Sequence, residues 1–136
     1  FTLGQGAALT EGKDALLFSY GPVMLHEALL AGELLAERGF GLKVVNMPWL
    51  NRVDSIWFSE TLKPYSTIFV LEDHHPAGGL MDNLLAECAE NGLLNDRQMV
   101  KFAVEGFPAC GTPQQALTYH QLDGLSLSKR VMEYCG

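Results

Sequence analysis

The sequence predicts an α/β fold, in which a mostly parallel sheet lies between two layers of helices. Two features of the chain support this fold class. Short apolar runs, some of them rich in β-branched and aromatic residues, alternate with longer segments that have helical spacing. Several of these runs are continuously apolar, which is typical of strands buried on both faces of a sheet. A three-layer α/β/α arrangement follows, because each βαβ unit packs its helix on one face of the sheet.

Five segments are predicted as strands, and they occupy residues 7–9, 15–19, 43–46, 67–71 and 100–104. The run Thr67-Ile68-Phe69-Val70-Leu71 is the strongest of them, because β-branched and aromatic residues favour strands. The segment 7–9 is short, and a tight turn joins it to the next strand. We therefore expect segment 7–9 to be antiparallel or irregular.

Five helices are predicted in residues 23–38, 54–62, 80–90, 111–117 and 127–134. The first is the clearest, since apolar residues recur at helical spacing between Pro22 and the two glycines Gly39 and Gly41. Asp54 is expected to cap the second helix through its side-chain oxygen.

Length and charge narrow the classes of function. A chain of 136 residues fits a single domain, here residues 1–136 with an opening segment and short first strand in 1–14. The net charge is −7 and no run of Lys or Arg occurs, so nucleic acid and anionic membranes are poor partners. The three cysteines are scattered, which favours a reducing cytoplasm over a disulfide framework. The chain begins with Phe1 rather than Met, which suggests a piece of a longer protein.

Two loops are the candidates for a functional site. In doubly wound sheets, ligands bind beyond the carboxyl ends of the strands, where the strand order reverses. The candidate crevice or interface residues that follow predicted strands are Ser19, Tyr20, Gly21, Glu72, Asp73, His74, His75, Gly78 and Gly79. His26 and Glu27, early in the first helix, are expected to be surface or interface groups.

The Glu72–Gly79 loop permits three interpretations. Its acids and histidines could ligate a metal, although neighbouring residues on an extended chain point in opposite directions. The free N–H groups of the helix after Gly78 and Gly79 could bind an anion. The interpretation we favour is that the glycines form a turn, while the acids and histidines pack or hydrogen-bond at a surface that serves as an interface.

The chain resembles the C-terminal domain of transketolases along nearly its whole length. The segment that matches best runs from Val70 to Leu80, V-L-E-D-H-H-P-A-G-G-L, and is similar to the family pattern V-x-E-(E/D)-H-x-x-x-G-G. The other matching segments are 3–15, 26–39, 44–47, 111–113 and 122–123. The sequence departs from the family at Arg52-Val53-Asp54, where the family has Pro-Leu-Asp, and at Trp49.

The resemblance implies a five-stranded mixed sheet with one antiparallel strand, and it places strand 15–19 between strands 43–46 and 67–71. It also implies that thiamine diphosphate and Mg²⁺ are bound in the full enzyme by two other domains, so that none is expected in this chain and no catalytic, cofactor-binding or metal residue is assigned here. The expected partners are other domains or subunits of the same enzyme, within a homodimer, and the implied role is structural or regulatory.

Three functions remain open at this point. The first is the structural and subunit-contact domain of a transketolase, which transfers two-carbon ketol units between sugar phosphates. The second is the same domain in a deoxyxylulose-phosphate synthase, or in the beta subunit of a 2-oxo-acid dehydrogenase, where it would bind a partner subunit. The third is an independent anion or metal sensor that uses the Glu72–Gly79 loop.

Overall fold

The computed structural model describes residues 2–136, so Phe1 of the predicted opening segment lies outside the described residues. Its five-stranded sheet has the order β1-β3-β2-β4-β5. The strands are β1 (Ala7–Ala8), β2 (Ala15–Ser19), β3 (Leu42–Asn46), β4 (Thr67–Leu71) and β5 (Gln98–Phe102). Only β1 is antiparallel to its neighbour, and the other three pairings are parallel. The mixed sheet and the central position of β2 are therefore confirmed.

The strand order reverses at β2, which pairs with β3 on one side and with β4 on the other. Ser19, the last residue of β2, lies opposite Asn46 of β3 and Leu71 of β4. The carboxyl ends of these three strands therefore meet at one edge of the sheet. This is the edge at which ligands bind in many folds of this class.

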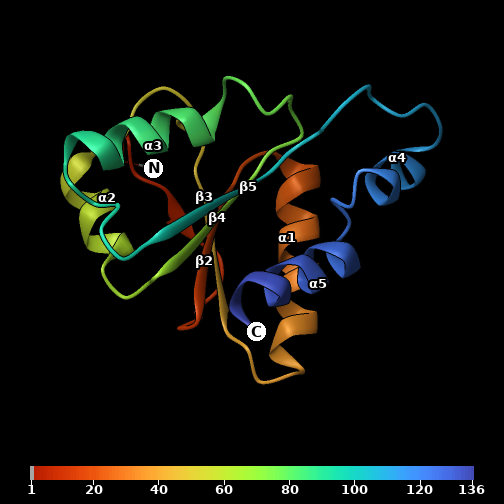
Figure 1. Cartoon of the computed structure of the whole chain (residues 1–136), viewed down its shortest axis with the longest axis horizontal. Coiled ribbons are helices and arrows are strands. Elements are labelled where there is room, and N and C mark those ends of the chain that lie inside the picture. The colour runs from red at the N-terminus through yellow and green to blue at the C-terminus, as the bar shows by residue number, and fades with distance from the viewer. Residues whose placement is uncertain (1) are drawn as a thin grey trace.

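Helices cover both faces of the sheet (Figure 1). The helices are α1 (Pro22–Ala36), α2 (Ser55–Leu62), α3 (Leu80–Glu90), α4 (Pro113–Tyr119) and α5 (Gly124–Cys135). In Figure 1, α2 and α3 lie on one side of the sheet and α1 and α5 on the other, while the short α4 lies farther out. This confirms the three-layer α/β/α prediction.

Each face of the sheet has its own hydrophobic core. Leu17 and Phe69 belong to the cluster that packs against α1 and α5, while Leu16 and Phe18 belong to the cluster under α2 and α3. Neighbouring residues of β2 thus point to opposite faces, and all five are buried, as the continuous apolar run predicts. Burying each large side chain contributes about 1.5–3 kcal/mol, so the strands anchor the edge from which the loops project.

Several predicted boundaries are wrong by two or three residues, including the end of α1 and both ends of α4. The last strand was expected at 100–104 but runs from Gln98 to Phe102, because the Gln98 N–H extends the pairing to Ser66 O at 2.8 Å. The last helix was expected from residue 127 but begins at Gly124, because Asp123 caps it by accepting from Ser126 N at 3.2 Å. Asp54 caps α2 as predicted, accepting from the N–H groups of Ile56 and Trp57.

Within residues 2–136, the helices are too short or too polar for any of them to cross a lipid bilayer.

Candidate functional site

The carboxyl ends of β2 and β4 are tied together by side chains of the candidate loops. The buried hydroxyl of Ser19 donates a hydrogen bond to Leu71 O at 2.9 Å. The half-buried Tyr20 extends across the same crevice, and its phenol O–H lies 3.2 Å from Glu72 Oε1. The two candidate loops therefore contact each other at the switch point.

Glu72 is fully buried and caps helix α3 from a strand end. Its Oε1 accepts a hydrogen bond from Leu80 N at 2.7 Å, and its Oε2 accepts one from Met81 N at 3.1 Å. The first N–H groups of a helix lack partners within the helix, and they attract negative charge. Glu72 therefore occupies the position where a bound anion would lie.

Lys101 of β5 compensates the buried charge of Glu72. Its Nζ lies 3.5 Å from Glu72 Oε2 and 3.7 Å from Asp82 Oδ1, and it donates to the carbonyl of Pro76. A buried carboxylate is tolerated when it is both hydrogen-bonded and paired with a charge, and Glu72 meets both conditions.

Glycine is required at Gly79 by its surroundings. Gly79 has φ +114°, and a Cβ built there would overlap with Glu72 Oε1. Gly78 has φ +73° but open space around it. The predicted turn is confirmed, and the close approach at Gly79 is what lets the helix reach the Glu72 carboxylate. Gly21, which precedes α1, also has a positive φ of 77°.

Asp73, His74 and His75 are exposed, unlike Glu72. The main chain of this segment is fixed, since Val104 N donates to His74 O at 2.9 Å and Ala77 N donates to His75 Nδ1 at 3.1 Å. The three side chains line a shallow hollow of about 330 Å³ beside Val104. Three of the four polar side chains of the loop thus lie at the surface, whereas Glu72 is buried and hydrogen-bonded, and the role of this surface as an interface stays a prediction.

The ligand interpretations of the loop find little support. The N–H groups expected to bind an anion already donate to Glu72. In the described part of the chain, no group of three or more His, Cys, Asp or Glu side chains is placed to hold a metal ion. A diphosphate at the start of α3 would meet the Glu72 carboxylate, so these residues do not fit the diphosphate group of thiamine diphosphate.

The environment of Tyr20 changes its acidity. Burial, followed by the nearby Glu72 carboxylate and the hydrogen bond to it, raises the pKa of Tyr20 to about 12, and Asp73 adds to this effect. Tyr20 therefore remains a neutral donor to Glu72 at physiological pH.

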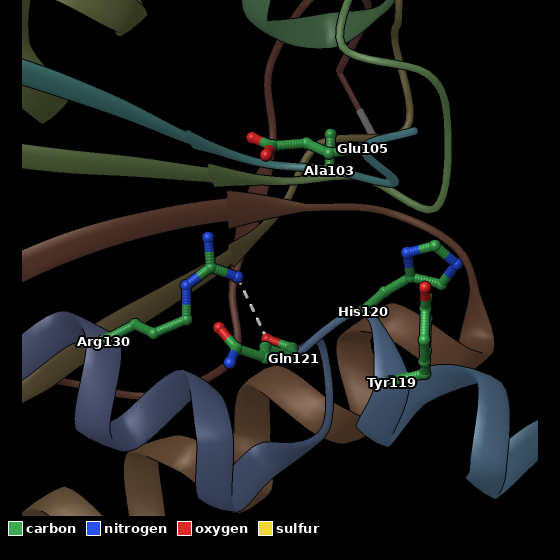
Figure 2. Close-up of a pocket in the computed structure, with 6 residues that line it drawn as sticks. All are labelled: Ala103, Glu105, Tyr119, His120, Gln121 and Arg130. Carbon is green, nitrogen blue, oxygen red and sulfur yellow. Dashed lines mark hydrogen bonds between the residues drawn. The ribbon is translucent and has the colours of Figure 1, made fainter. Parts of the chain in front are cut away.

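A second hollow near this edge, of about 260 Å³, has no sequence motif that could reveal it (Figure 2). Arg130 of α5 lies over the Phe102 ring at 4.3 Å and donates to Gln121 O at 3.0 Å. His120 accepts at Nε2 from Ala109 N at 3.0 Å, which leaves its proton on Nδ1. The lining groups are Ala103, Glu105, Tyr119, His120, Gln121 and Arg130.

The placement of Glu27 corrects a further expectation. It is 5% exposed rather than a surface group, and its Oε2 accepts a hydrogen bond from Gly124 N at 2.7 Å. The two residues are 97 positions apart, so no local sequence signal indicates the contact. His26, one position earlier, is exposed as expected.

These features define a small three-layer α/β domain whose switch point is filled by its own side chains. The family model described as "Transketolase, C-terminal domain" matches residues 4–125, so the chain belongs to the transketolase C-terminal domain family.

Among curated proteins, the chain is similar to one described as a transketolase C-terminal section from Methanocaldococcus jannaschii. The two are 33% identical over 98% of this chain and 40% of that protein. It is also 26% identical, over 97% of this chain and 20% of the relative, to the 1-deoxy-D-xylulose-5-phosphate synthase of Syntrophotalea carbinolica. The chain therefore spans well under half the length of these relatives.

Among solved structures, a split-gene transketolase described as an inactive beta4 tetramer matches with a TM-score of 0.84. That match has 27% identity over 98% of this chain and 43% of the other. A transketolase from Pichia stipitis matches with a TM-score of 0.64 and 16% identity over 96% of this chain and 18% of the other, which indicates a shared fold.

Proposed function

We propose that this chain is a single structural and subunit-contact domain of a transketolase-type enzyme that transfers two-carbon ketol units between sugar phosphates. In this proposal, thiamine diphosphate and Mg²⁺ are bound by other domains, which carry out the chemistry. The chain contributes assembly and positioning. The enzyme acts as a homodimer in the cytoplasm, and regulation through this domain is compatible with the same role.

The observation that supports this proposal is the filled switch point. Glu72, Tyr20 and Lys101 occupy the place where folds of this class usually bind ligands, and they neutralise one another there. The loop is therefore built to hold its own shape. A segment with a rigid main chain and exposed polar side chains suits contact with another protein surface.

We further propose that the exposed side chains of this edge form the contact. Asp73, His74 and His75 project from the fixed segment, and exposed Gly21 and Gly78 lie on the same two loops. The buried Ser19 and Glu72 and the partly buried Gly79 support this contact by fixing the main chain of the two loops.

Reconstitution tests this function. The chain is mixed with the polypeptide of the same enzyme that carries the cofactor-binding domains, and mass is measured by light scattering after size exclusion. We expect a complex whose ketol transfer from a ketose phosphate to an aldose phosphate requires thiamine diphosphate, while the chain alone is inactive. Turnover by the chain alone, or the absence of any complex, would overturn the proposal.

A deoxyxylulose-phosphate synthase is the second candidate. Its specific support is the 26% identity over 97% of this chain to the Syntrophotalea enzyme. The same reconstituted complex distinguishes the two candidates by supplying pyruvate and glyceraldehyde 3-phosphate in place of two sugar phosphates. A third candidate, the 2-oxo-acid dehydrogenase beta subunit, predicts instead that the chain binds the acyltransferase subunit.

A further inference from the structure

A hollow of about 370 Å³ between α1 and the start of α5 is lined by an excess of negative charge. Its carboxylates are Glu27, Glu33 and Glu37 of the α1 segment and Asp123 at the start of α5, and no lysine or arginine lines it. Carboxylates that share one hollow repel one another unless a cation approaches them. The hollow is therefore suited to a positively charged group.

Asp123 provides an independent sign that a hydrogen-bond donor is missing. It is only 8% exposed, and its Oδ2 accepts from Ser126 N at 3.2 Å. Its Oδ1 is buried and has no hydrogen-bond partner within residues 2–136. Buried carboxylate oxygens are nearly always hydrogen-bonded, because an unpaired charge out of water is costly. Asp123 thus retains an acceptor that the described chain does not use.

The lining of the hollow favours an organic cation over a metal ion. Among the described residues, no group of three or more metal-ligating side chains lies close enough to hold a metal. Leu30 and Leu125, which also line the hollow, are 37% and 52% exposed. Apolar walls with carboxylates suit a side chain that has an aliphatic stem and a cationic end.

We propose that this hollow receives an arginine side chain from the rest of the enzyme, with its guanidinium donating to Asp123 Oδ1. A guanidinium carries five donors in a planar fork, so it can serve several carboxylate oxygens at once. Because Oδ1 is covered in the free chain, this binding mode requires the lining of the hollow to open over Asp123. The source of the arginine rests on the proposed function, whereas the cation site itself does not.

A capped arginine, N-acetyl-arginine amide, tests the cation site directly on this chain. Its neutral isostere, N-acetyl-citrulline amide, has nearly the same shape and serves as the control probe. We expect capped arginine to shift the ¹H–¹⁵N signals of Gly124 and Ser126 in a saturable way, with an affinity at least threefold higher than that of the citrulline analogue. Equal binding of the two probes, or no saturable shift, would overturn the proposal.

Asp123→Asn and Asp54→Asn form a matched pair of variants. Both residues cap helices and both changes remove one negative charge, but Asp54 lies at the start of α2 on the other face of the sheet. Asparagine is as good an N-cap as aspartate. We expect Asp123→Asn to weaken the binding of capped arginine about tenfold and to leave the melting temperature of the protein equal or higher. We expect Asp54→Asn to leave the affinity for capped arginine unchanged. A purely structural Asp123 would give a lower melting temperature with unchanged probe affinity.

Association with the polypeptide that carries the cofactor-binding domains tests the source of the arginine. We expect Asp123→Asn to weaken that association at least tenfold, and excess capped arginine to compete with it. If capped arginine binds as expected but neither change affects the complex, the assignment of the arginine to the rest of the enzyme is wrong. If no complex forms while the probe still binds, the proposed function fails and the cation site stands.

Discussion

Two helix N-termini in the described chain receive the buried carboxylate of a glutamate that lies outside the helix, and they differ in what surrounds it. At α3, Glu72 accepts hydrogen bonds from two backbone N–H groups and from the Tyr20 hydroxyl, and its Oε2 lies 3.5 Å from the Lys101 ammonium. At α5, Glu27 accepts from Gly124 N, while the neighbouring Asp123 leaves one oxygen unpaired.

The difference indicates what each end contributes. The carboxylate at α3 is hydrogen-bonded and paired with a positive charge from the same chain, so it needs no partner from another molecule. The carboxylates at α5 line a hollow that contains no lysine or arginine. A carboxylate that is satisfied internally stabilises the fold, whereas one that lacks a donor lowers the stability of the free chain and offers a binding site to another molecule.

Alanine substitutions at the two buried glutamates give the largest expected difference. Glu72→Ala leaves Leu80 N and Met81 N without partners and Lys101 without its buried counter-charge, so we expect a loss of about 3–5 kcal/mol in the free energy of unfolding. Glu27→Ala removes one hydrogen bond to Gly124 and also relieves repulsion near Asp123, so we expect about 1–2 kcal/mol.

Urea denaturation measures both changes. If Glu72→Ala does not fold, Glu72→Gln keeps one acceptor oxygen and should still cost more than Glu27→Gln. Equal losses of unfolding free energy at the two sites would mean that the two helix ends are alike, which would contradict the difference described above.

Alanine at the two adjacent glycines tests how closely the α3 end is packed. Gly79→Ala adds a methyl group that overlaps with Glu72 Oε1 at a backbone with φ +114°, so we expect a loss of about 3 kcal/mol. Gly78→Ala changes a position with φ +73° and open space, so only the backbone strain of about 1–2 kcal/mol applies. Thermal melts of both variants check the order, and a larger loss at Gly78 would contradict it.

The residue patterns were sufficient to identify the strands and the cap of α2, and the family resemblance supplied the strand order. Continuous apolar runs identified β2 and β4, because strands buried on both faces need apolar side chains at every position. Asp54 was predicted as a cap because an aspartate before a helix bonds N–H groups two and three residues ahead. Such contacts are local, and local residue patterns encode them.

The charged contacts between distant segments could not be predicted in the same way. A glutamate that follows a strand is usually exposed. Its burial here depends on Lys101 and on the start of α3, which only the folded chain brings together. Glu27 and Gly124 are 97 positions apart, and the unpaired oxygen of Asp123 becomes visible only when every donor around it is known.

The smallest expected effect concerns Tyr20, whose hydroxyl donates a hydrogen bond to Glu72 at the start of α3. Because folding raises the pKa of Tyr20 from its ordinary value of 10.0 to about 12, its contribution to stability is complete below pH 10 and is lost as the pH rises toward 12. We expect Tyr20→Phe to cost about 1 kcal/mol at pH 7, where the hydrogen bond to Glu72 is intact.

The difference between wild type and Tyr20→Phe should therefore shrink across pH 10–12, as seen in melting temperatures measured in parallel. Ultraviolet difference titration of the two proteins assigns the midpoint of the missing phenol. A midpoint near 10, with a stability difference that does not depend on pH, would mean that Tyr20 is not part of the Glu72 network. The α3 end would then rely on Lys101 and the two helix N–H groups alone.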